Sequence, residues 1–125
     1  MRRGMPVVAV GAAMLLLAGC AAPGARPSRF LEREPLTSCG EVELGQGEDI
    51  PQSARDCLED TAGSELVVTR PTVEGEPVTE WQRHLAGGDY EYFTDMTQDS
   101  FGGGWWYTFC PRSEDDTAEC RTEEL

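Results

Sequence analysis

Cysteine is the residue type in this chain whose placement points most directly to chemistry. The first of the five cysteines, Cys20, directly follows an apolar run over residues 7–18, and Arg2 and Arg3 precede that run. A basic start, a short apolar segment and small residues before a cleavage point are typical of a secretory signal peptide. The run is shorter than the roughly 20 apolar residues that a membrane-spanning helix needs. We therefore predict a signal peptide over residues 1–19.

The end of the apolar run carries the sequence Leu17-Ala18-Gly19-Cys20. This motif resembles the lipobox of bacterial lipoproteins, in which the cysteine thiol accepts a diacylglyceryl group. An ordinary signal peptide with an incidental cysteine is the alternative, but it would leave an odd exported thiol beside four others. Several acyl chains, such as palmitate, give stable anchoring where one chain is marginal. The sequence predicts lipidation of Cys20 and a location on the extracytoplasmic face of the cell membrane, and it leaves the general secretory and twin-arginine export routes open.

The four remaining cysteines are expected to form two disulfides, because exported proteins fold in an oxidising compartment. Four cysteines allow three pairings, and the sequence does not choose among them, although order along the chain suggests Cys39 with Cys57 and Cys110 with Cys120. A zinc site is not expected, because there is no Cys-x-x-Cys motif and the single His84 lies far from every thiol. We predict no metal and no cofactor.

The charge of the chain after cleavage argues against some partners. All 23 acidic residues lie beyond residue 19, and removal of two of the ten arginines leaves eight, so the net charge is about 8 − 23 = −15. Nucleic acids and anionic lipid surfaces are bound through basic patches. We expect no nucleic-acid partner, and we interpret the surplus of carboxylates mainly as a solubilising surface.

The chain divides into an unpatterned start and one small domain. Residues 20–36 are rich in Ala, Pro and Arg and are predicted to be a flexible tether, which leaves residues 37–125 as the domain with an acidic C-terminal tail. A helix is expected over residues 53–62, because Ser53 and Asp56 resemble a capping box and apolar residues recur at helical spacing. Gly63 would end this helix.

Strand patterns follow the predicted helix. Alternating and aromatic-rich segments, separated by turns that contain glycine, predict strands at residues 65–71, 77–85, 90–95 and 105–111. We therefore expect an α+β domain in which one short helix packs on an antiparallel sheet of about four strands, in two layers braced by disulfides. The tail after residue 111 is too acidic for a core element, and we expect the disulfide of Cys120 to attach this tail to the domain.

Two loop motifs resemble those of a domain-of-unknown-function family of small bacterial lipoproteins. They are Thr72-Val73-Glu74-Gly75-Glu76-Pro77 and Asp95-Met96-Thr97-Gln98-Asp99-Ser100-Phe101-Gly102. The family shows Thr-x-Glu-Gly-Asp-Pro and Asp-x-Thr-x-Asp-x-aromatic-Gly, so Glu76 departs from the usual Asp, and the extra cysteines depart as well. The similarity covers roughly residues 57–110 and implies fold and location only, because the family has no assigned activity. From the residues themselves, Asp95 and Asp99 are expected to close their own loop as Asx turns.

A non-enzymatic binding or interaction module is the function that we expect. The chain holds more aromatic residues than one face of a small sheet must bury, and Trp81, Trp105 and Trp106 are the candidate binding residues. Trp105 and Trp106 are adjacent, so in a strand they point to opposite faces, and one of them could line a site for a protein or cell-wall partner. If other segments cover the second face, no such site forms.

Catalysis is not expected. His84 is the only imidazole, and Ser100 lies outside a Gly-x-Ser-x-Gly elbow. The turn carboxylates of Glu74 and Glu76 could in principle act as acid and base, but we expect them to be solvated. A calcium-stabilised loop at Asp95, Thr97 and Asp99 is an alternative, although the bidentate Glu of an EF-hand is missing. Inhibition of a secreted enzyme is a further alternative within the binding class.

Overall fold

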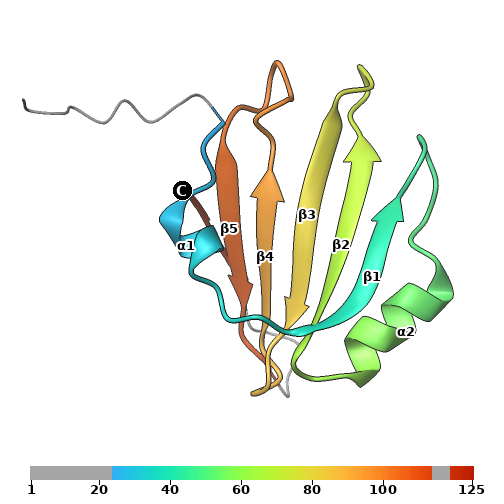
Figure 1. The fold of residues 1–125 in the computed structure, drawn as a ribbon, viewed down its shortest axis with the longest axis vertical. Coiled ribbons are helices and arrows are strands. Elements are labelled where there is room, and N and C mark those ends of the chain that lie inside the picture. The colour runs from blue at the N-terminus through green and yellow to red at the C-terminus, as the bar shows by residue number, and fades with distance from the viewer. Residues whose placement is uncertain (1–23, 114–118) are drawn as a thin grey trace, which may run out of the picture.

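The computed structural model describes residues 24–113 and 119–125, so the predicted signal peptide and the lipidation at Cys20 lie outside the described residues. The described elements form a six-stranded sheet with the strands in chain order, accompanied by two short helices. Figure 1 shows the sheet with α1 at its β5 side and α2 at its β1 side. The elements are α1 (Ser28–Leu31), β1 (Thr37–Glu43), α2 (Gln52–Asp60), β2 (Ser64–Pro71), β3 (Pro77–His84), β4 (Tyr90–Asp95), β5 (Trp105–Cys110) and β6 (Arg121–Glu124).

The sheet is mostly antiparallel. β1 pairs with β2 in parallel, with α2 in the connection between them, and every later pair is antiparallel. The α+β class is therefore confirmed, whereas the expectation of about four strands is wrong. β1 and β6 escaped prediction because exposed residues dominate the first and the second is exposed throughout, so neither shows the apolar alternation of a half-buried strand.

Helix α2 covers one face of the sheet over β1, β2 and β3. Its buried residues Ala54 and Leu58 form an apolar cluster with Leu66 and Val68 of β2. The predicted capping box is wrong: α2 follows Pro51 and has no side-chain cap. Pro51 itself occupies the N-cap position, and its side chain has no oxygen that could accept a capping hydrogen bond.

The second face of the sheet is covered by the segment that we predicted to be a tether. Phe30 of α1 is fully buried in a cluster with Phe93, Trp105 and Tyr107, and Trp81 packs against this cluster. The structure corrects the tether prediction from residue 24 onward: burial of Phe30 on the aromatic surface and the ion pair of Arg33 with Glu65 fix this segment on the sheet. The domain therefore begins well before residue 37.

The hairpins lie where the glycine-containing turns predicted them. Gly75, with a φ of 95°, donates its N–H to the carbonyl of Thr72 at 3.0 Å in the β2–β3 turn. Gly88, with a φ of 91°, bonds in the same way to Leu85 at 2.9 Å in the β3–β4 turn. Because a positive φ strains residues that carry a Cβ, glycine suits both positions.

Candidate functional site

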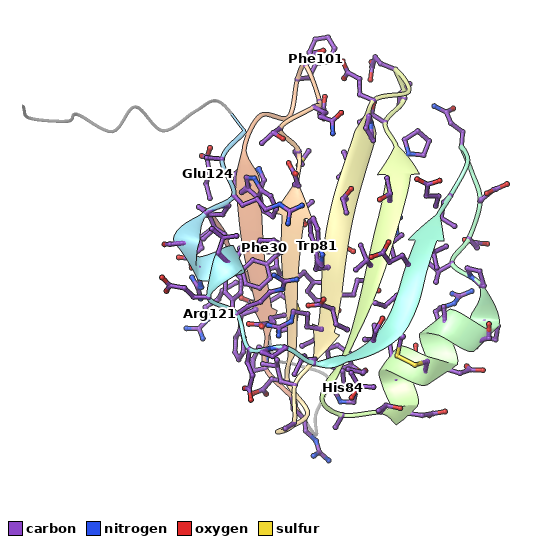
Figure 2. The ribbon with its side chains drawn as sticks, viewed as in Figure 1. Phe30, Trp81, His84, Phe101, Arg121 and Glu124 are labelled. Atoms are coloured by element: carbon purple, nitrogen blue, oxygen red, sulfur yellow. A yellow bond between two sulfur atoms is a disulfide. The ribbon has the colours of Figure 1, made fainter. Side chains whose placement is uncertain are left out.

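Of the three tryptophans that we selected as binding candidates, Trp105 lies in the core and Trp81 is partly buried against it. The rings of Trp81 and Trp105 stack on each other with their centroids 5.4 Å apart, and the ring of Phe30 lies 4.6 Å from the first and 4.7 Å from the second. Trp105 is only 4% exposed. Figure 2 shows Phe30 beside Trp81 over the middle of the sheet. These two indoles therefore stabilise the fold through their packing on Phe30, and Trp105 is too deeply buried to form part of an exposed platform.

Trp106 lies on the opposite face from its neighbour and stays partly exposed. In the strand register, Trp106 pairs with Thr94 of β4 and with Glu124 of β6. Two residues further along β5, Thr108 pairs with Tyr92 of β4. On this face α2 lies over β1, β2 and β3, and its apolar cluster reaches Tyr90 at the start of β4. Within the described part of the chain, the rings of Trp106 and Tyr92 belong to neither core cluster. The part of this face that neither described helix covers is formed by Tyr92, Thr94, Trp106 and Thr108, and we call it the open platform.

Hydroxyl groups surround the aromatic rings of the open platform. The hydroxyls of Thr108 and Thr122 lie 2.9 Å apart on neighbouring strands, and Thr94 donates at 3.5 Å to the carboxylate of Glu80. A flat surface of aromatic rings and hydroxyl groups offers both apolar contact and hydrogen bonds to a partner. The strands hold these groups in place without any loop.

A groove of about 480 Å³ runs along one side of the open platform, between it and α2. Tyr92 belongs to both surfaces, so the groove and the platform are continuous. A partner that lies on the platform can therefore extend a side chain or ring toward the helix. The groove is lined by Ile50, Arg55, Leu58, Glu59, Gln82, Tyr90 and Tyr92.

The tyrosines of the groove are held as neutral phenols. Burial raises the pKa of Tyr92, and the nearby charge of Glu80 raises it further. Burial also raises the pKa of Tyr90, with a smaller contribution from Glu59. The ring of His84 stacks on Tyr90 with centroids 4.5 Å apart, so the edge of the groove is packed. At neutral pH both phenols can donate and accept hydrogen bonds, and neither can act as a base.

The other face holds a buried charge network that sequence reasoning missed. Arg83 is 2% exposed and forms ion pairs with Glu65, at 2.9 Å from Nε to Oε2, and with Glu91. Arg33 also reaches Glu65, at 3.1 Å, so the predicted tether supplies a partner to this network. Opposite charges packed together in this way stabilise one another, and removing one would leave the others uncompensated. We interpret this network as structural.

The carboxylates of Asp95, Asp99 and Glu76 form hydrogen bonds within the loops. The Oδ1 atom of Asp95 accepts the N–H of Thr97 at 3.0 Å, and that of Asp99 accepts the N–H of Phe101 at 2.9 Å, which confirms the predicted Asx turns. The carboxylate of Glu76 accepts from the N–H and hydroxyl of Ser100. Among the described residues, no group of three or more His, Cys, Asp or Glu side chains is placed to hold a metal ion.

The disulfides join the cysteines that are neighbours along the chain. Cys39 is bonded to Cys57, which fastens α2 to β1, and Cys110 is bonded to Cys120, which leads into β6. This is the pairing that order along the chain suggested. Two disulfides fit an oxidising, extracytoplasmic environment.

Comparisons with protein-family models, curated proteins and solved structures find no match to this chain. Within residues 24–113 and 119–125, no helix has the length and apolar character needed to cross a bilayer.

The alternation of the last predicted strand placed Thr108 on the same face as Trp106, but sequence reasoning missed Tyr92 and Thr94 of the neighbouring strand as its companions. Tyr92 and Thr94 lie two residues apart on β4, and Trp106 and Thr108 lie two residues apart on β5. The sequence alone therefore shows that the members of each pair point to the same face of their strand. The missing information was the register between β4 and β5, which decides which faces coincide.

Proposed function

We propose that this protein is an exported, lipid-anchored binding module without enzymatic activity, and that it binds its partner through the open platform. The observation that carries the proposal is the contrast between the two indoles at the start of β5. Trp105 is buried beneath Phe30, whereas Trp106 faces outward beside Tyr92 and a set of threonine hydroxyls. Exposed aromatic rings on a rigid surface favour binding, because little side-chain freedom is lost on contact.

The lipid anchor at Cys20 remains part of the proposal and is supported by the lipobox-like motif and by the two disulfides. The resemblance to the lipoprotein family of unknown function supports the same location. The absence of catalysis is proposed on the residues present. The carboxylates of Glu76, Asp95 and Asp99 are already engaged in loop hydrogen bonds, so the loops offer little for acid–base chemistry.

The test is capture of the partner on intact cells. The lipidated protein is crosslinked at the membrane, purified and examined by mass spectrometry, in the wild type and as Trp106→Ala and Leu31→Ala. Leu31 is 62% exposed but lies on α1, which covers the other face of the sheet, so it serves as the matched control. We expect one specific protein or wall fragment that is retained by Leu31→Ala and lost by Trp106→Ala. A companion that survives Trp106→Ala would contradict the proposed binding surface.

A further inference from the structure

Two loop tips at one end of the sheet expose large apolar side chains. Val73 in the β2–β3 turn is 89% exposed, and Phe101 in the β4–β5 loop is 83% exposed. Because β2, β3, β4 and β5 are antiparallel neighbours, both loops lie at the same end of the sheet. Figure 2 shows Phe101 at the extreme tip of its loop. We call Val73 and Phe101 the tip pair.

Hydrogen bonds hold the two loops in position. The carboxylate of Glu76 bridges from the β2–β3 turn to the N–H of Ser100, at 2.9 Å, and to its hydroxyl. The side chain of Gln46 donates to the carbonyl of Val73 at 3.2 Å. The Asx turn at Asp99 fixes the N–H of Phe101. The tip pair is therefore presented outward by braced loops, and neither side chain contributes to a core cluster.

The described chain starts at the same end of the sheet. Figure 1 shows its first residues beside the beginning of β5, at the end that carries the β4–β5 loop. Burial of Phe30 fixes this segment on the sheet. Only residues 21–23 separate Gly24 from Cys20, and four steps of extended chain span at most about 14 Å. A lipid on Cys20 would therefore hold this end of the sheet close to the bilayer.

We propose that Val73 and Phe101 insert into the boundary between headgroups and acyl chains of the membrane that holds the Cys20 anchor. This inference rests on the lipid anchor of the proposed function. Apolar and aromatic side chains bind that boundary by burying their surface. Glu74 directly follows Val73, and Asp99 lies two residues before Phe101, so the contact depends on apolar burial and not on attraction to anionic lipids. The sheet then stands upright on the membrane with the open platform facing sideways.

The test uses the full lipidated protein in phosphatidylcholine vesicles whose acyl chains carry bromine, which quenches nearby indoles. Phe101→Trp places a new indole at the loop tip, and Leu31→Trp places one on α1, where Leu31 is 62% exposed. Both positions are exposed, so both variants should fold as the wild type does. We expect brominated vesicles to remove most of the fluorescence that Phe101→Trp adds, and to leave the fluorescence added by Leu31→Trp.

Flotation of the same vesicles separates the two possible failures. A protein that does not float with the vesicles has no anchor, and this result overturns both the lipidation and the orientation. A protein that floats, but whose added indole at position 101 is quenched no more than that at position 31, overturns the orientation alone.

Discussion

The two faces of the sheet are closed in different ways. One face receives a nine-residue helix that a disulfide fastens to β1 and that lies over β1 to β3, with Tyr90 of β4 at its edge. The other face receives a four-residue helix that has no disulfide and relies on a single buried phenylalanine and on arginines. The extent of the helical cover, and not the number of aromatic residues, therefore decides which aromatic rings stay partly exposed.

The largest expected effect is on the face closed by Phe30. Phe30→Ala removes a fully buried ring that contacts two indoles, so we expect a loss of about 3–5 kcal/mol in the free energy of unfolding. Leu31→Ala, one residue further along the same helix, should change it by less than about 0.5 kcal/mol. Urea denaturation of both variants measures the difference. Equal, small effects would mean that residues 24–36 are a tether after all.

The next effect concerns the face that α2 partly covers. Replacing Cys39 and Cys57 together by serine removes a cross-link between residues 18 apart, and we expect a loss of roughly 2–4 kcal/mol. Because the apolar contacts of Leu58 remain, α2 should still form. Thermal unfolding followed by far-ultraviolet circular dichroism measures both quantities. A loss of all helical signal before unfolding would show that the disulfide alone holds α2 in place.

The smallest effect is a pH dependence on the Phe30 face. Burial raises the pKa of Tyr107, and so does its hydrogen bond to Glu91 at 2.8 Å, while Arg29 acts in the opposite direction. A phenol whose pKa is raised in the folded state stabilises the fold below the unfolded pKa of about 10, and this contribution is lost as pH rises through the folded pKa. Denaturation midpoints from pH 8 to pH 11 should fall more steeply for the wild type than for Tyr107→Phe. Parallel curves would contradict this account.

The central hairpins could be predicted from the sequence because each strand alternates and each turn carries glycine. β4 was predicted with its observed bounds, and β3 to within one residue. Local patterns of this kind depend only on neighbouring residues.

The parts that could not be predicted depend on contacts between distant residues. Phe30 is the one aromatic residue of residues 24–36, and its packing on the distant Trp81 and Trp105 makes that segment part of the domain. β6 is charged and exposed and forms because it pairs with β5. The open platform was predicted in part, since the adjacency of Trp105 and Trp106 placed one of them outward, but which one depends on what covers each face.

Acrylamide quenching of tryptophan fluorescence tests this difference between the faces most directly. Trp81 and Trp105 pack with Phe30 on the closed face, whereas Trp106 lies on the open platform. The account predicts that quenching of the native protein falls in Trp106→Phe and is unchanged in Trp105→Phe, because Trp105 is only 4% exposed. If quenching instead falls in Trp105→Phe and is unchanged in Trp106→Phe, the assignment of the two faces is wrong.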